Sequence, residues 1–228
     1  MNDRNPAAAR RLAARSRFLW TVAPPVLRGV GRSLFSLEVE QETPLPDPPF
    51  VLAANHYSHL DPPAIAAALD IPIRYLALED LFVANRLLDW LITGFGAIPT
   101  PRFRVPIGAV RTALGALDSG EVVGVFPEAT RVTHWGTLPP KRGAAWLATR
   151  SGVPLVPVAI VGTGQALGLE NKVHRAPIRV ISGPPVAVGD IDEMTSVWAA
   201  WMTTQIGRFP ASEVDGPRRA EFDPSMRP

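Results

Sequence analysis

Residues 50–69 read F-V-L-A-A-N-H-Y-S-H-L-D-P-P-A-I-A-A-A-L, an apolar run, a polar turn and a second apolar run. The first run, 50–54, has the length and the unbroken apolar character of a buried strand. A short helix is expected at 62–69, because proline is favoured in the first turn of a helix. The sequence therefore predicts a strand, a turn that contains two histidines, and a helix.

Short apolar runs and helical periods continue to alternate along the rest of the chain. Further strands are expected at 73–78, 97–98, 122–126, 155–161 and 178–181. Further helices are expected at 81–92, 105–117, 143–150 and 191–208. In the second of these, Ile107, Val110, Leu114 and Leu117 predict one buried face. Strands that alternate with helices are typical of an α/β domain with a mostly parallel sheet flanked by helices.

The N-terminus is rich in arginine. Residues 1–35 contain seven arginines and a single acid, Asp3. The apolar stretch 18–27 is shorter than the roughly twenty residues that span a membrane, and it does not suit a secretory signal. We expect a helix at 7–22, a break at Pro24-Pro25 and a second helix at 26–37, both lying in the membrane interface. The alternative is a solvated helix packed on its own domain.

The composition excludes several kinds of chemistry. The 228 residues include no cysteine, which excludes disulfides, thiolate nucleophiles and cysteine metal sites. The two lysines, Lys141 and Lys172, lie outside any P-loop motif, so a nucleotide site of that kind is excluded. There is no G-x-S-x-G motif to supply a serine nucleophile.

The turn after the first strand contains a candidate catalytic pair, His56 and Asp61. On one continuous helix these side chains would point about 140° apart. The prolines that follow place Asp61 at the N-cap, so that the turn 55–60 can fold His56 back toward it. A histidine held by a carboxylate is an oriented general base, suited to a substrate hydroxyl that attacks an activated acyl group. Two alternatives stay open: Asp61 only caps the helix, or His56, His59 and Asp61 bind a metal ion.

A second polar cluster, V-F-P-E-A-T-R, ends the strand expected at 122–126. Arginine offers a planar fork that suits a phosphate, and Lys141 begins a helix whose free N–H groups favour an anion. The alternative for this cluster is a surface Glu–Arg pair. Together the cations suggest a phosphorylated acceptor, with candidate contacts from Arg102, Glu128, Thr130, Arg131 and Lys141.

Four blocks in this order resemble the 1-acylglycerol-3-phosphate acyltransferase family and its glycerolipid acyltransferase relatives. The blocks are N-H-Y-S-H-L-D (55–61), G-A-I-P-T-P-R (96–102), F-P-E-A-T-R (126–131) and V-P-L-V-P-V-A-I (153–160). The resemblance implies that His56 is the base and Asp61 its orienting acid. It also implies that Arg102, Glu128 and Arg131 bind the glycerol phosphate, and we add Asn55 and Ser58 as candidate substrate-binding residues. One departure is Ala129, where the family usually has glycine; a positive φ there would cost alanine about 1 kcal/mol.

The resemblance implies transfer of a fatty acyl group from acyl-CoA or acyl carrier protein to lysophosphatidic acid, giving phosphatidic acid. No covalent acyl-enzyme, metal or cofactor is expected, and no nucleic acid partner. We expect a basic membrane-interface segment at 1–37, an acyltransferase domain at 38–209, and a flexible tail at 210–228. The location expected is the cytoplasmic face of the cell membrane. The alternatives are another acceptor (glycerol 3-phosphate, a lysophospholipid or a glycolipid), a metal-dependent hydrolase, and a membrane-binding protein without catalysis.

Overall fold

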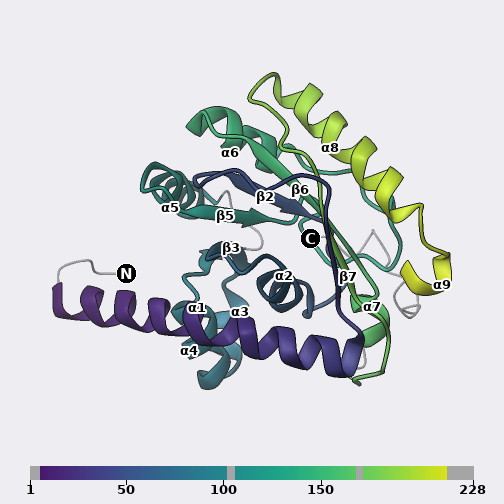
Figure 1. The fold of residues 1–228 in the computed structure, drawn as a ribbon. Coiled ribbons are helices and arrows are strands. Elements are labelled where there is room, and N and C mark those ends of the chain that lie inside the picture. The colour runs from purple at the N-terminus through teal and green to yellow at the C-terminus, as the bar shows by residue number, and fades with distance from the viewer. Residues whose placement is uncertain (1–5, 102–105, 168–171, 215–228) are drawn as a thin grey trace.

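The computed structural model describes residues 6–101, 106–167 and 172–214, which form a seven-stranded sheet flanked by helices (Figure 1). The strand order is β1-β7-β6-β2-β5-β3-β4. All neighbouring strands are parallel except β6 and β7. The expected α/β class with a mostly parallel sheet is therefore confirmed. The strands are β1 (Glu38–Gln41), β2 (Val51–Ala54), β3 (Ile73–Leu78), β4 (Ile98–Thr100), β5 (Val122–Val125), β6 (Leu155–Val161) and β7 (Arg179–Ser182).

Helices cover both faces of the sheet, with α1 and α2 on one side and α6 and α8 on the other (Figure 1). The helices are α1 (Pro6–Phe35), α2 (Asp61–Leu69), α3 (Asp80–Ala84), α4 (Arg86–Gly94), α5 (Ile107–Asp118), α6 (Gly143–Ser151), α7 (Thr163–Ala166), α8 (Ile191–Ile206) and α9 (Ala211–Val214).

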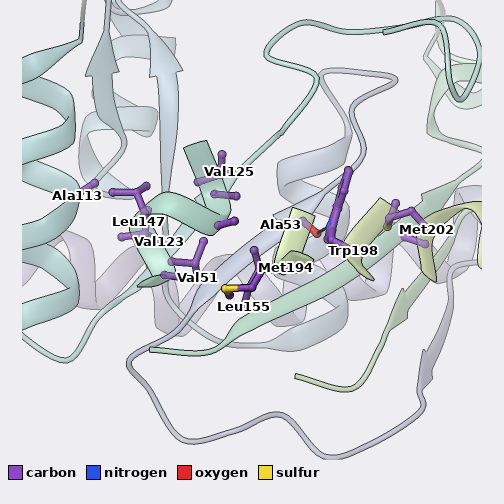
Figure 2. Close-up of a cluster of buried hydrophobic side chains, with 14 of the residues drawn as sticks. Val51, Ala53, Ala113, Val123, Val125, Leu147, Leu155, Met194, Trp198 and Met202 are labelled. Carbon is purple, nitrogen blue, oxygen red and sulfur yellow. Dashed lines mark hydrogen bonds between the residues drawn. The ribbon is translucent and has the colours of Figure 1, made fainter. Parts of the chain in front are cut away.

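Strand β2 is buried on both faces, which explains its unbroken apolar run. Val51 and Ala53 face a cluster formed with α5, α6 and α8, whereas Leu52 and Ala54 face a cluster formed with α2. Figure 2 shows the first cluster, in which the indole N–H of Trp198 donates to the backbone oxygen of Ala53 at 2.9 Å. The strand that precedes the histidine turn is thus held rigidly in the core.

The expected N-terminal helix pair is wrong, because α1 runs unbroken through Pro24 and Pro25. A proline inside a helix costs about 3 kcal/mol, so packing must offset this cost. Contacts on both sides of the prolines do so: Trp20 Nε1 donates to the oxygen of Phe95 at 3.3 Å, and Arg28 Nε donates to that of Ala67 at 2.7 Å. Tertiary anchoring therefore overrides the local signal.

Three other expectations need correction. The helix expected at 81–92 is divided at Asn85, which is extended and whose side chain accepts the N–H groups of Leu87 and Leu88 to begin α4. The buried face of α5 consists of Ala109, Ala113, Ala116 and Leu117, while Ile107 is exposed. The first part of the tail expected at 210–228 contains α9, whose Val214 is buried, and residues 215–228 lie outside the described residues. The sequence reading also missed β1 and α7.

Candidate active site

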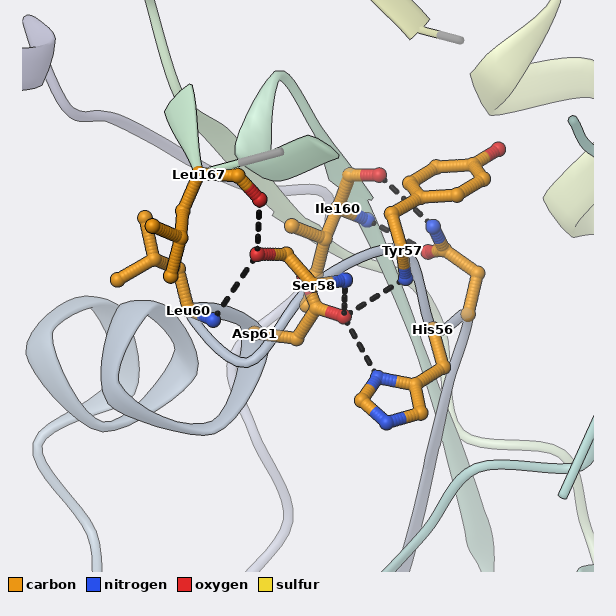
Figure 3. A network of polar contacts seen from close by, with 8 residues as sticks. His56, Tyr57, Ser58, Leu60, Asp61, Ile160 and Leu167 are labelled. Carbon is orange, nitrogen blue, oxygen red and sulfur yellow. Dashed lines mark hydrogen bonds and ion pairs between the residues drawn. The ribbon is translucent and has the colours of Figure 1, made fainter. Parts of the chain in front are cut away.

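The turn between β2 and α2 folds His56 onto Asp61, as the sequence predicted. Nδ1 of His56 lies 2.7 Å from Oδ2 of Asp61, and the other ring nitrogen points away from the carboxylate (Figure 3). The same oxygen accepts the backbone N–H groups of Tyr57 and Ser58, both at 2.8 Å. Three donors suit a carboxylate oxygen, which only accepts hydrogen bonds. The arrangement orients the imidazole as a general base requires.

Asp61 is the first residue of α2, not the N-cap residue that the sequence predicted. The N-cap is Leu60, whose backbone is helical and which makes no side-chain capping bond. The carboxylate is fully buried and binds the preceding turn, so it does not cap the helix. The predicted contact is therefore confirmed, while the predicted capping position is wrong by one residue.

Asn55 and Ser58 hold the turn in place. The side-chain amide of Asn55 donates to the backbone oxygen of Ile160 at 2.9 Å and accepts its N–H at 2.8 Å (Figure 3). Ser58 Oγ donates to the oxygen of Leu167 at 3.0 Å and accepts the N–H of Leu60. Both side chains are buried, and their polar atoms are hydrogen-bonded to backbone groups, which favours a role in positioning the turn. That they contact the substrate stays a prediction.

The second polar cluster lies beside this turn, because β2 and β5 are neighbouring parallel strands. The N–H of Val132 donates to the oxygen of His56 at 2.8 Å, and that of Lys141 donates to the oxygen of Pro127 at 2.8 Å. Burial lowers the pKa of His59, and the charge of Arg131 lowers it further, which places that arginine near the histidine turn. Thr130 and the Lys141 side chain are exposed, and Arg102 lies outside the described residues.

Glu128 is a buried acid next to the candidate catalytic pair, His56 and Asp61. Within the described part of the chain, neither of its carboxyl oxygens makes a hydrogen bond of good geometry. Burial raises the pKa of Glu128 to about 8, and the charge of Asp61 adds to the rise. Backbone N–H groups of Glu128 and His56 oppose this rise only in part. At neutral pH the group is mostly a neutral acid that can donate a hydrogen bond to a ligand oxygen.

This carboxyl makes stability depend on pH. Between its ordinary pKa of 4.5 and its raised pKa of about 8, the folded protein keeps a proton that the unfolded chain has released. The free energy of unfolding therefore falls as pH rises through this window, by about 2 kcal/mol between pH 6 and 8. Glu128→Gln, which does not titrate, should lose this part of the slope in urea unfolding at pH 6, 7 and 8. The exposed Glu193→Gln is the control, and equal slopes for wild type and Glu128→Gln would contradict the assignment.

Ala129 replaces the glycine that is usual in the family. Its backbone is left-handed, the conformation for which the sequence analysis gave the cost to alanine. Its φ is +58°, a conformation that costs a residue with a Cβ about 1–2 kcal/mol. The N–H of Ala129 donates to the oxygen of Phe126 at 2.9 Å, which closes the turn. This chain therefore closes the turn with alanine in a left-handed conformation, and the methyl group of Ala129 is exposed.

The described residues bear on two questions, whether a metal site is formed and whether a helix could cross a membrane. In 6–101, 106–167 and 172–214, no three His, Asp or Glu side chains are grouped so that they could hold a metal ion. The metal site suggested for His56, His59 and Asp61 is therefore not formed. Over the same ranges, no helix has both the length and the apolar character needed to cross a membrane.

One feature of the site was missed by the sequence reading. The ring of Phe126 is stacked on the imidazole of His56, with centroids 4.1 Å apart and planes inclined by 17°. Phe126 is also stacked with Tyr75, with ring centroids 5.5 Å apart and planes inclined by 11°. A signal was present in Gly124, because glycine inside a strand indicates a close approach by another group.

The comparisons with known proteins identify the family of this chain. Residues 36–161, more than half of the chain, match the model of the family described as Acyltransferase. The chain belongs to the Acyltransferase family, which confirms the resemblance inferred from the four sequence blocks.

Within this family, the chain is similar to proteins named 1-acyl-sn-glycerol-3-phosphate acyltransferase. It is 30% identical to that of Bacillus subtilis over 151 residues, which are 66% of this chain and 73% of the relative. It is 29% identical over 150 residues to the chloroplastic BAT2 of Brassica napus, covering 64% of this chain. The chain spans only 43% of the length of that chloroplast relative.

A solved structure supports the fold. The chain superimposes on the crystal structure of the 1-acyl-sn-glycerophosphate (LPA) acyltransferase PlsC from Thermotoga maritima with a TM-score of 0.67. The match covers 88% of this chain and 84% of that chain at 23% sequence identity. The two proteins therefore share the α/β architecture described above.

Proposed function

We propose that this protein transfers a fatty acyl group from a thioester, acyl-CoA or acyl carrier protein, to the free hydroxyl of lysophosphatidic acid, producing phosphatidic acid. The observation that carries the proposal is the 2.7 Å contact between His56 Nδ1 and Asp61 Oδ2 in a chain of the Acyltransferase family. The names of its relatives support lysophosphatidic acid as the acceptor.

The reaction uses one base and no covalent intermediate on the protein. Nε2 of His56 takes the proton of the acceptor hydroxyl while the oxygen attacks the thioester carbonyl carbon. Asp61 accepts the hydrogen bond from Nδ1 and stabilises the imidazolium that forms. As the C–S bond breaks, the imidazolium returns the proton to the leaving thiolate. The products are the ester and the free thiol, and His56 is neutral again.

The phosphate of the acceptor is bound by the cations near the turn. Arg131 approaches the histidine turn from the end of β5, and Lys141 begins the segment that packs on Pro127. Arg102 is proposed to bind the same phosphate, as the resemblance to the family implies. The neutral carboxyl of Glu128 donates to a glycerol or phosphate oxygen, so that binding aligns the hydroxyl with His56.

The test of this function is a panel of acceptors offered to the full chain with one labelled acyl-CoA. The panel contains lysophosphatidic acid, glycerol 3-phosphate and lysophosphatidylcholine, and labelled acyl carrier protein is run in parallel. Labelled phosphatidic acid from lysophosphatidic acid is expected to be the main product. No turnover of lysophosphatidic acid, with turnover of another acceptor, would replace the proposed substrate but leave the acyl transfer chemistry in place.

The protein is further proposed to act at an anionic membrane surface, on the cytoplasmic face. Helix α1 contains no acidic residue, and its apolar residues at four-residue intervals form an exposed ridge. A second apolar surface lies on α3 and α4, and α4 contacts α1 through Arg15, which lies 5.3 Å from the centre of the Trp90 ring. Basic and apolar side chains on one helix suit the headgroup boundary. The exposed apolar residues are Phe18, Val22, Val26, Val30 and Leu34 on α1, and Val83, Leu87 and Trp90 on α3 and α4.

Removing part of the ridge should weaken membrane binding. The double variant Val22→Ser and Val26→Ser loses roughly 2 kcal/mol of apolar burial, which corresponds to about 30-fold weaker partitioning. Sedimentation with vesicles of phosphatidylglycerol and phosphatidylcholine measures this change. The matched control is Val188→Ser with Val197→Ser, two valines that are similarly exposed elsewhere. Equal binding by both double variants would show that α1 does not contact lipid.

A further inference from the structure

The candidate base is held by two different kinds of contact. Its hydrogen bond to Asp61 fixes Nδ1 but leaves the imidazole free to turn about that contact. Phe126 covers one face of the imidazole, with ring centroids 4.1 Å apart and nearly parallel planes. Stacked aromatic pairs prefer such geometry, so Phe126 restricts the plane of the imidazole ring. A hydrogen bond and a stack together define the direction of Nε2.

Phe126 is itself stacked with Tyr75, with ring centroids 5.5 Å apart and planes inclined by 11°. Tyr75 belongs to β3, whereas Phe126 directly follows β5. The three rings therefore form one stack that begins in the sheet and ends at His56. Phe126 thus packs on both rings, and its contact with Tyr75 helps to hold it beside the imidazole.

Gly124 creates the space for this stack. It is the residue directly opposite Tyr75 in the pairing of β3 with β5. A Cβ at Gly124 would lie 2.5 Å from Cδ1 and Cε1 of Tyr75, closer than any real contact. The Tyr75 ring thus lies across the glycine, where it packs against the backbone of β5.

The hydroxyl of Tyr75 contributes differently from its ring. The hydroxyl is buried and has no hydrogen-bond partner within the described ranges. Burial raises its pKa well above the ordinary value, and the charge of Asp61 raises it further, so it stays protonated. The ring provides the packing on Phe126, and the two contributions can be separated by substitution.

We propose that Phe126 and Tyr75 are positioning residues for acyl transfer, because their stack holds the imidazole of His56 in the plane that directs Nε2 at the acceptor hydroxyl. This inference rests on the proposed role of His56 as the base. Neither ring needs to touch the substrate, so their loss should lower kcat and leave KM for the acceptor within about twofold.

The test compares variants that keep or remove each ring. Phe126→Leu and Tyr75→Leu should each lower kcat about tenfold, which is the upper range for a stacked pair. Tyr75→Phe retains the ring and should keep the wild-type kcat. Rates are normalised to the folded fraction measured by near-ultraviolet circular dichroism, so a loss of folding is not mistaken for a loss of positioning.

Two further measurements separate positioning from a structural role. Stacking shifts the imidazole C–H proton resonances of His56 upfield, and this shift should disappear in Phe126→Leu. In a His56→Ala background, Tyr75→Leu should cause no further loss of the residual rate, because the residue through which it acts is gone. A normal kcat for both leucine variants, or an equal loss in the His56→Ala background, would overturn the inference. Full activity of His56→Ala itself would instead overturn the assignment of the base.

Discussion

His56→Ala is expected to lower the rate of acyl transfer roughly 10³-fold, the middle of the range for removing a general base. The hydroxyl of the acceptor is a weak nucleophile unless its proton is removed as it attacks the thioester. KM for lysophosphatidic acid should change little, because the phosphate is bound by other residues. The measurement is the initial rate of labelled product with saturating acyl-CoA.

The control for this substitution is His174→Ala. His174 is exposed and lies on the segment before β7, and within the described residues its side chain makes no hydrogen bond or ion pair with His56 or Asp61. Its loss should leave the rate within about twofold, a change of less than 0.5 kcal/mol. If both alanine variants retained the wild-type rate, His56 could not be the base.

Asp61 substitutions are expected to have the second largest effect, and two variants separate charge from hydrogen bonding. Asp61→Asn can still accept the three hydrogen bonds through its amide oxygen, but it cannot stabilise the imidazolium by charge. Its kcat should fall roughly 10²-fold to 10³-fold, while folding is largely preserved. Asp61→Ala should match this loss of activity.

Stability distinguishes these two variants. Asp61→Ala leaves the buried N–H groups of Tyr57 and Ser58 without an acceptor, at about 1–3 kcal/mol each. Urea unfolding should therefore show a larger loss for alanine than for asparagine. Asp118→Asn, at an exposed position at the end of α5, is the control for both assays. Wild-type kcat in Asp61→Asn would show that the charge has no part in the reaction.

The sequence predicted the part of the site that depends on neighbouring residues. Pro62 and Pro63 restrict the backbone before them, so the fold-back of His56 onto Asp61 followed from local rules. The buried strand β2 was equally predictable, since an apolar run without alternation needs cover on both faces. From the sequence one could say only that a positive φ at position 129 would be unfavourable for alanine. The structure shows that the φ of Ala129 is indeed positive.

Other features depended on contacts between distant residues. Nothing in the sequence specified that β5 pairs with β2, which is what brings Glu128 to Asp61. The continuity of α1 through Pro24 and Pro25 depends on Phe95 and Ala67, both remote in sequence. The stack on His56 required Tyr75 to lie opposite Gly124, a register known only once the strands are paired. Tertiary packing in each case determined what local propensity could not.

The central claim is that this chain acylates lysophosphatidic acid with His56 as the base, and one measurement tests it most directly. Purified wild type and His56→Ala are each mixed with labelled acyl-CoA and lysophosphatidic acid, and labelled phosphatidic acid is followed over time. We predict that wild type forms phosphatidic acid and that His56→Ala forms it roughly 10³-fold more slowly. Equal rates of phosphatidic acid formation by the two proteins would contradict the claim.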